Sequence, residues 1–276
     1  MPFLYITEEE EENIKAYHAP WGIPLTDNEA LNISVLYHMD HITGYSSTVR
    51  MPMWTSFSIH PDQEDDFMKM QPDWSLASDA RLEPESTPTC SNYDILKRLN
   101  FTMMPLFPHA YNSNVNRTSH LISNAIPVSQ DIKHRWRGLM GTLVPAWLAS
   151  QGPLNVILGP VFDHNSDSLP DDFAAFRNNP VVPTDLFAVL TRCQTEITSL
   201  DLCPENMLDS SSFIFHQDQP ISNCLDQEAF TLQYSSRVRD VELATSFSFF
   251  LNVPFEYRIA QVLRVQQPQL WPLENT

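Results

Sequence analysis

Residues Met51–Ile59 read MPMWTSFSI, a run rich in aromatic and β-branched side chains. This composition is typical of a β-strand, and other short apolar runs along the chain predict strands as well. They are Leu31–Tyr37, Leu121–Ile126, Leu154–Leu158, Pro183–Leu190 and Ser211–Phe215. The pair Gly159-Pro160 is expected to end the run that starts at Leu154. Strands and helices mix irregularly, which argues against repeated βαβ units and predicts an α+β fold with a largely antiparallel sheet.

Two segments between or after these runs predict helices. Apolar side chains of Gln130–Ser150 recur three or four residues apart, as one face of an amphipathic helix requires. They are Ile132, Trp136, Leu139, Leu143 and Trp147. Pro145 is expected to start a new turn or to kink this helix, because its ring clashes with the preceding turn. Asp226–Phe250 predicts a mostly polar helix followed by an aromatic cluster.

The length of 276 residues allows one large domain or two small ones, and 42% hydrophobic residues are enough to form a core. Residues 1–18 contain the run Glu8–Glu12 and predict an acidic leader that is disordered and solvated. Residues 19–265 are expected to form the folded domain. Residues 266–276 are expected to be a C-terminal tail.

The chain is strongly acidic, with 34 Asp and Glu against 16 Lys and Arg and a net charge of -18. Such a field repels phosphate backbones, which disfavours nucleic acid as a partner. No run of about 20 apolar residues occurs, so no membrane span is predicted. The N-terminus does not have the pattern of a signal peptide. Sequons at Asn32, Asn100 and Asn116 give only a weak indication of the secretory pathway.

The run Asp163–Asp171, DHNSDSLPD, repeats oxygen donors at every second position. The donors are the side chains of Asp163, Asn165, Asp167 and Asp171 and the backbone carbonyl of Leu169. This is the spacing of the first three quarters of an EF-hand loop. The run departs from that pattern at Ser168, where Gly is usual, and at Ala174, where Glu is usual. On the residues alone, a solvated acidic turn and a loop that wraps a hard cation such as Ca²⁺ are equally good interpretations.

The four cysteines have no Cys-x2-Cys spacing, so no zinc site is predicted. They are Cys90, Cys193, Cys203 and Cys224. Cys193 and Cys203 are near enough in sequence to close a short disulfide loop, which would stabilise the fold by roughly 3 kcal/mol. Buried reduced thiols are the alternative that the spacing leaves open.

The order of several landmarks resembles a known family. The landmarks are Gly44-Tyr45-Ser46, Met51–Ser56 (MPMWTS), Ser123–Pro127 (SNAIP), Trp136, Asn155–Ile157 (NVI), Gly159–Asp163 (GPVFD) and Arg237–Glu242 (RVRDVE). From about Pro20 to about Val265 the chain resembles the C-terminal nuclease-like domain of the ectonucleotide pyrophosphatase/phosphodiesterase family. That domain is similar to the DNA/RNA non-specific endonuclease superfamily. The resemblance implies a ββα-metal core on a twisted, largely antiparallel sheet flanked by helices.

The resemblance also implies which catalytic residues to expect. Active members of the superfamily use the His of an Asp-Arg-Gly-His motif as general base and an Asn that holds Mg²⁺. This chain contains no Asp-Arg-Gly-His, and Val128–Trp136, where the Asn is expected, offers Lys133 and His134 instead. Neither a catalytic residue nor a Mg²⁺ site is therefore assigned, and a catalytically inactive pseudonuclease is expected. The alternative is a divergent metal-dependent endonuclease, a hydrolase that binds nucleic acid, with His109 as substitute base.

Related domains carry a Ca²⁺ loop with the spacing of Asp163–Asp171, so the resemblance favours a structural calcium ion over an acidic turn. It implies a disulfide between Cys193 and Cys203. Cys224 resembles the cysteine that tethers this domain to the phosphodiesterase domain, and Cys90 resembles one whose partner lies upstream. The expected partner is therefore a phosphodiesterase catalytic domain, in cis or through Cys224 or Cys90. The expected location is extracellular or in the secretory lumen, with glycans on the sequons.

Overall fold

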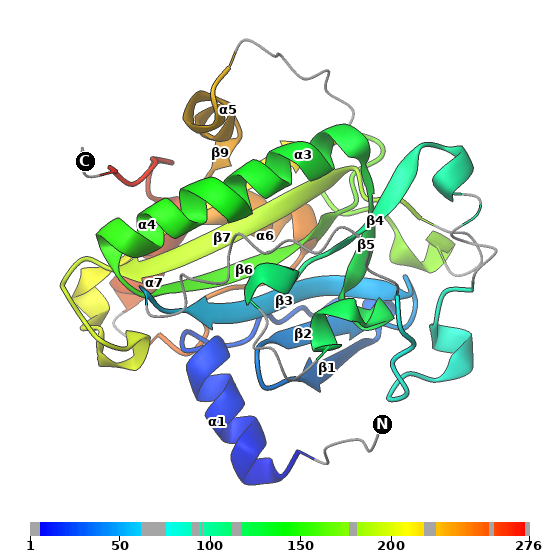
Figure 1. Ribbon diagram of the computed structural model, residues 1–276, viewed down its shortest axis with the longest axis horizontal. Helices are drawn as coiled ribbons and strands as arrows, with labels where there is room; N and C mark the ends of the chain where they lie inside the picture. Colours follow the sequence, from blue (N-terminus) through cyan, green and yellow to red (C-terminus); the bar gives the residue numbers. More distant parts are fainter. Residues whose placement is uncertain are drawn as a thin grey trace.

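The fold is built on one antiparallel sheet and one smaller ribbon (Figure 1). The computed structural model describes residues 6–61, 76–89, 94, 96–111, 117–176, 181–217, 225–253 and 257–273. Within these ranges, the seven-stranded sheet has the order β1-β2-β3-β6-β7-β8-β9, and each neighbouring pair is antiparallel. Its strands are β1 (Ile33–Tyr37), β2 (Ile42–Ser46), β3 (Met51–Ile59), β6 (Leu154–Val161), β7 (Asp185–Cys193), β8 (Leu208–His216) and β9 (Ser235–Ser236). The antiparallel ribbon consists of β4 (Phe101–Pro105) and β5 (Ala125–Ser129). The predicted α+β class and largely antiparallel sheet are confirmed.

Five of the six predicted strands coincide with strands of the structure, although not always in length. The predicted strand Leu121–Ile126 is wrong over most of its length, because Ile122–Asn124 form a 3-10 turn and β5 starts only at Ala125. β3 occupies Met51–Ile59 as predicted, and every residue of it is buried. β6 continues through Gly159 and Pro160 to Val161, so the expectation that this pair ends the strand is wrong. Its pairing with β3 stops at Leu158, while its pairing with β7 continues to Val161. Pro160 is tolerated because it lies beyond the last residue of β6 that pairs with β3, so its missing N–H interrupts no pairing on that side.

Two family landmarks, on β2 and β3, pack directly against each other. A Cβ atom on Gly44 would lie 2.2 Å from the indole ring of Trp54, which is fully buried. The pairing of β2 with β3 also shifts register between Gly44 and Tyr45. Only glycine leaves room for the ring to lie across the backbone at this irregularity. Gly44 and Trp54 therefore have a packing role.

One long helix crosses a face of the sheet (Figure 1). It consists of α3 (Gln130–Gly138), the π-helical turn η7 (Leu139–Leu143) and α4 (Val144–Gln151). The predicted helix Gln130–Ser150 and its buried apolar face are confirmed. Pro145 does not break the helix, because a wider π turn precedes it. In that turn Val144 N donates to the carbonyl of Leu139, five residues back, and Pro145 next in the series has no N–H to donate.

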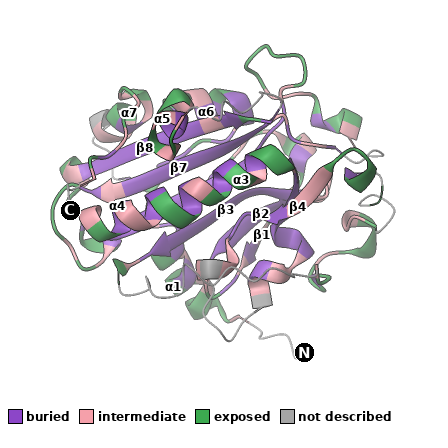
Figure 2. Cartoon of the chain, turned by 45° about the horizontal axis from the view of Figure 1, so that its top comes forward, coloured by how far each residue is buried: buried purple, intermediate pink, exposed green. Residues whose placement is uncertain are grey.

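Different helices cover the two faces of the sheet. Two residues of β8, Phe213 and Ser210, show this, because alternate side chains of a strand point to opposite faces. Phe213 stacks with Trp147 of α4, with ring centroids 6.3 Å apart. Ser210, on the opposite face, donates a hydrogen bond of 3.1 Å from its hydroxyl to the carbonyl of Leu263 in α7 (Tyr257–Val265). Figure 2 shows buried strands beneath α3 and α4, whose outward sides are exposed. Among the described helices, none combines the length and apolarity needed to cross a bilayer.

The acidic N-terminal segment is helical, so the prediction that residues 1–18 are disordered is wrong for α1 (Glu8–His18). The hydroxyl of Thr7 accepts a hydrogen bond from Glu10 N, and the Glu10 carboxylate accepts one from Thr7 N at 2.7 Å. This reciprocal capping box starts the helix. The carboxylates of the first turn also favour it, because they lie at the positive end of the helix dipole.

Both flanks of the predicted domain 19–265 pack onto it. His18 at the end of α1 is buried, and its carbonyl accepts a hydrogen bond of 2.6 Å from the hydroxyl of Ser56 in β3. Trp271 is 2% exposed, although the sequence predicts a tail there, and its carbonyl accepts a hydrogen bond of 3.1 Å from Trp147 Nε1. The folded unit therefore extends beyond both predicted boundaries.

The segment Asp226–Phe250 forms two helices rather than the one predicted. α5 (Gln227–Gln233) starts at Asp226, whose carboxylate accepts a hydrogen bond of 2.8 Å from Ala229 N. β9 then interrupts the segment before α6 (Val238–Thr245). The aromatic cluster that follows is buried and comprises Phe247, Phe249 and Phe250.

Candidate metal centre

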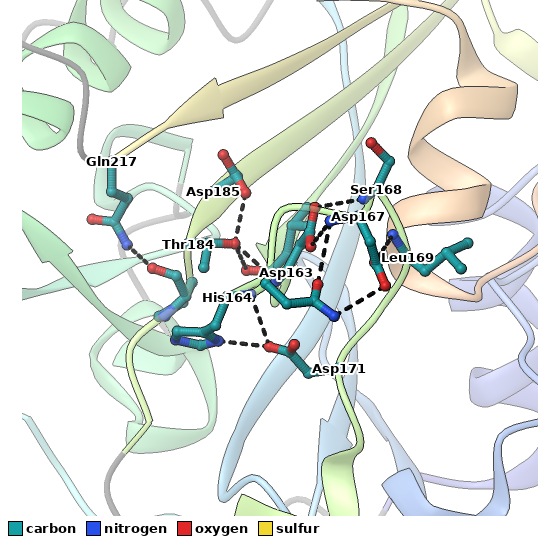
Figure 3. A network of polar contacts seen from close by, with 12 residues as sticks. Asp163, His164, Asp167, Ser168, Leu169, Asp171, Thr184, Asp185 and Gln217 are labelled. Atoms are coloured by element: carbon teal, nitrogen blue, oxygen red, sulfur yellow. Dashed lines mark hydrogen bonds and ion pairs between the residues drawn. The ribbon is translucent and has the colours of Figure 1, made fainter.

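The five residues predicted to bind Ca²⁺ share one surface loop between β6 and β7 (Figure 3). Buried Phe162 precedes the loop, and Asp171 N donates a hydrogen bond of 2.9 Å to the Phe162 carbonyl. This bond brings the two ends of the run together. The side chains of Asp163 and Asp171 are half-buried, and those of Asn165, Asp167 and Leu169 are exposed.

Asp163, the first residue of the loop, has its carboxylate directed into it. Oδ1 accepts a hydrogen bond from Asp167 N and Oδ2 accepts one from Ser168 N, both at 2.9 Å. Ser168 has a positive φ of 64°, the left-handed conformation for which Gly is usual in a loop of this spacing. The departure at Ser168 therefore leaves the backbone turn in place.

Asn165 and Asp167 extend the same pattern. Asn165 Oδ1 accepts a hydrogen bond from Asp167 N at 3.2 Å, and Asn165 Nδ2 donates to Asp167 Oδ2 at 3.0 Å. The other oxygen, Asp167 Oδ1, accepts from Leu169 N at 2.9 Å. Backbone N–H groups thus orient these side chains.

His164 lies next to the predicted ligands, and the spacing of oxygen donors did not single it out. Its ring Nδ1 lies 2.6 Å from Asp171 Oδ2, and its backbone N donates to the same oxygen at 3.1 Å. A hydrogen bond to a carboxylate holds that group in place. Asp171 is therefore oriented by His164, a residue inside the loop.

The donor set fits calcium in its chemistry. It offers three carboxylates, one amide oxygen and one carbonyl oxygen, and hard cations such as Ca²⁺ prefer oxygen ligands. A carboxylate oxygen that accepts one N–H keeps acceptor capacity for an ion. In the described part of the chain no three His, Cys, Asp or Glu side chains already converge on one point. The residues that would hold the ion are Asp163, Asn165, Asp167, Leu169 and Asp171, and the ion would offset two of the three negative charges of the aspartates.

His109, the candidate substitute base, lies in the short helix η4 (His109–Tyr111). Its Nδ1 is 2.7 Å from Ser119 Oγ, and its ring stacks on His120 with centroids 4.2 Å apart. Burial, and to a lesser extent His120, lowers the pKa of His109 to about 4. A general base is most effective with a pKa near the working pH, so His109 is a weak base at neutral pH.

Lys133 and His134 occupy the part of α3 where an active nuclease would need its Asn. Lys133 Nζ lies 3.4 Å from the hydroxyl of Thr102 in β4. Burial and the positive charge of Arg137 lower the pKa of Lys133. His134 is exposed. A lysine ammonium brings positive charge and three donors, so this position is unsuited to holding a cation.

The structure describes only some of the predicted cysteine and sequon positions. Cys193 at the end of β7 and Cys203 form a disulfide, which confirms the predicted pair. The sequon residues Asn32 and Asn100 are exposed. The remaining predicted positions, Cys90, Cys224 and Asn116, lie outside the described residues.

Similarity to known proteins covers most of this chain but a minority of each relative. No family model matches the chain. It is 31% identical over 262 residues to ectonucleotide pyrophosphatase/phosphodiesterase family member 3 of Mus musculus, covering 90% of this chain and 30% of that protein. It is 28% identical over 263 residues to the venom phosphodiesterase of Macrovipera lebetinus, covering 90% and 30%. For venom phosphodiesterase 2 of Crotalus adamanteus the identity is 29% over 261 residues, covering 90% and 32%.

These matches show which family the chain resembles and how much of each relative it covers. The chain spans less than a third of the length of the relatives described above. The matches confirm the resemblance seen in the order of the landmarks. The chain is thus a homologue of the nuclease-like region of the ectonucleotide pyrophosphatase/phosphodiesterase family.

Proposed function

We propose that this chain is a catalytically inactive nuclease-like domain, stabilised by calcium, whose role is to support a phosphodiesterase-type partner. The chemistry of the two positions that a nuclease would need carries the proposal. The sequence contains no Asp-Arg-Gly-His. His109, the candidate substitute base, has a pKa lowered to about 4. The helix that would hold the metal-binding Asn presents Lys133. Neither position supplies an efficient base or a ligand for Mg²⁺.

A plasmid-cleavage assay tests the inactive assignment. Purified protein is incubated with supercoiled plasmid in Mg²⁺ and, as control, in EDTA. We expect no nicking above the EDTA control. Cleavage that requires Mg²⁺ and is lost in His109→Ala would contradict the proposal and favour the divergent endonuclease.

The calcium part of the proposal rests on the loop Asp163–Asp171 and on the resemblance. Carboxylates held on one short loop repel each other, and an ion that binds only the folded chain stabilises it. At a calcium concentration of 100 times Kd the gain is about 2.7 kcal/mol. We expect the melting temperature to rise with Ca²⁺ and terbium luminescence to titrate in wild type but not in Asp163→Asn.

Asp172→Asn is the matched control for the loop. Asp172 is an exposed carboxylate that directly follows the predicted ligands. It should retain the calcium response of wild type. Equal loss in both variants, or no calcium response in wild type, would contradict the calcium assignment.

The partner is proposed to be a phosphodiesterase catalytic domain outside the cell. The chain matches less than a third of each named phosphodiesterase, and the names describe an ectonucleotide enzyme and venom proteins. Denaturing gels of native material, with and without reductant, test this proposal. A species much larger than 31.7 kDa in both lanes is the expected result. A species of 31.7 kDa in both lanes would contradict a covalent partner.

A further inference from the structure

The loop Asp163–Asp171 is attached to the sheet at its first residue by a side chain from another segment (Figure 3). Asp163 N donates a hydrogen bond of 3.0 Å to the hydroxyl of Thr184. Thr184 precedes β7, and β6–β7 pairing brings it beside the start of the loop, where Thr184 N donates to the Val161 carbonyl at 2.9 Å. Thr184 therefore fixes the point from which the Asp163 carboxylate is directed.

The hydroxyl of Thr184 is itself oriented. It donates to Asp185 Oδ2 at 2.6 Å, and a carboxylate is a stronger acceptor than the Val161 carbonyl at 3.2 Å. Asp185 is buried at the start of β7, and its other oxygen, Oδ1, bonds to His216 Nδ1 of β8. With its hydrogen directed to Asp185, the Thr184 oxygen presents a lone pair to Asp163 N. One hydroxyl thus joins the first loop residue to two strands of the sheet.

Gln217 holds the Thr184 backbone from the other side. Gln217 N donates to the Thr184 carbonyl at 3.0 Å, and Gln217 Nε2 donates to the Pro183 carbonyl at 2.7 Å. Its Oε1 accepts a hydrogen bond of 2.7 Å from Ser129 N, the N-cap residue of α3. The segment that carries Thr184 is therefore tied to β8 and to the long helix.

We propose that Thr184 is the positioning residue of the cation loop, setting through its hydroxyl the direction in which Asp163 meets a bound calcium ion. The proposal rests on the calcium function proposed above. Residues that orient metal ligands from behind typically change metal affinity by about 10–100-fold when replaced. Thr184 touches no ion in this role; it acts through the backbone of Asp163.

The test compares three variants of the full chain by titration with Ca²⁺ and with terbium luminescence. Thr184→Val removes the hydroxyl and keeps the shape, and Thr184→Ser restores the hydroxyl. Thr191→Val is the matched control, because Thr191 is buried in β7 and its hydroxyl has no hydrogen-bond partner among the described residues. Urea unfolding in EDTA verifies that each variant is folded before calcium is added.

We expect Thr184→Val to weaken calcium binding about tenfold, and Thr184→Ser and Thr191→Val to bind within about twofold of wild type. Unchanged affinity in Thr184→Val would overturn the inference while leaving the calcium site intact. Weak binding in Thr184→Ser, or equal weakening in Thr191→Val, would also overturn it, because the effect would then not belong to the hydroxyl. Absence of calcium binding in wild type would overturn both the inference and the calcium function.

Discussion

Three buried histidines lie where α1 meets the β1–β2 hairpin, and composition alone did not reveal them. Burial lowers the pKa of His18 to about 4. Burial and, after it, the positive charge of Arg81 both lower the pKa of His38. His41 is fully buried between His38 and Phe107, with ring centroids 4.1 and 4.3 Å away. Neither ring nitrogen of His41 has a hydrogen-bond partner among the described residues. Burial, followed by His38, His18 and Arg81, holds the pKa of His41 well below its ordinary value.

A pH dependence of stability follows from this cluster. The unfolded histidines take up protons below about pH 6.5, whereas the folded ones stay neutral. Their contribution to stability should therefore be full above pH 6.5 and fall as the pH drops toward about 4, the folded pKa of His18. Asp79, paired with Arg81, has a lowered pKa, so its contribution is lost only in stronger acid, as the pH falls through that lowered pKa. His216 acts in the opposite direction and above this range: its bond to Asp185 raises its pKa, so its contribution is full below pH 6.5 and is lost as the pH rises through the raised pKa.

His41→Phe isolates one member of the cluster. Phenylalanine keeps the stacking and needs no hydrogen-bond partner, so we expect unchanged or higher stability at pH 7.5. At pH 5 the variant should lack one destabilising protonation of the unfolded chain, a gain of about 2 kcal/mol over wild type. Urea unfolding at both pH values measures this, with the exposed His134→Gln as control. A smaller gain at pH 5 than at pH 7.5 would contradict the mechanism.

At the scale of one element, the long helix depends on a side chain from outside it. Pro145 has no N–H, so the carbonyl of Met140, five residues earlier in the π-helical series, receives none from it. The hydroxyl of Tyr111 in η4 donates to that carbonyl at 2.5 Å. The tyrosine thus satisfies a buried backbone acceptor that the proline leaves open.

Tyr111→Phe should cost about 1–3 kcal/mol, because it leaves the Met140 carbonyl buried without a donor. In a Pro145→Ala background the restored N–H can donate to that carbonyl, so the same change should cost less. A double-mutant cycle by urea unfolding measures the coupling. Equal costs in the two backgrounds would show that Tyr111 and Pro145 act independently.

Local patterns predicted the elements better than their ends. The aromatic and β-branched run Met51–Ile59 coincides with β3, because such a run is a local signal. The end of β6 could not be predicted, since whether Pro160 is tolerated depends on where the pairing of β6 with β3 stops. For α1, acidic composition suggested disorder, yet the capping box at Thr7 and the burial of Ile14 are what decide its state.

At the candidate site, too, the features that are local in sequence were predicted, and those that depend on contacts between distant segments were not. The predicted ligands Asp163–Asp171 lie in one loop, because their alternation is local in sequence. His164 lies inside that loop, but a spacing pattern of oxygen donors passes over it. Thr184 was not foreseeable, because it is 21 residues from Asp163 and only the β6–β7 pairing brings the two together.

For the whole molecule, the C-terminal segment closes one face of the fold. The Trp271 ring meets the ring of Trp147 edge-on, with centroids 5.5 Å apart, and the Arg192 guanidinium lies 5.0 Å from its centroid. Ser211 of β8 donates a hydrogen bond of 2.9 Å to the carbonyl of Gln269. This segment covers a helix and a strand at once, which makes it part of the core.

Trp271→Ala should therefore destabilise the protein by about 3–5 kcal/mol, as expected for loss of a buried aromatic side chain. Gln267→Ala, an exposed position of the same segment, should change stability by about 0.5 kcal/mol or less. Chemical denaturation of the full chain measures both. Similar small effects would mean that the segment is a dispensable tail.

The order of the sheet also decides where a second molecule could add to it. In the described residues, β1 and β9 are the outermost strands, and an outermost strand offers unpaired backbone groups to another chain. β9 has only two residues and therefore offers few backbone groups for pairing, whereas β1 has five residues. The sequon residue Asn32 directly precedes β1 and is exposed. A glycan there would stand beside the longer open edge, so material made without glycans should aggregate through β1 more readily than glycosylated material.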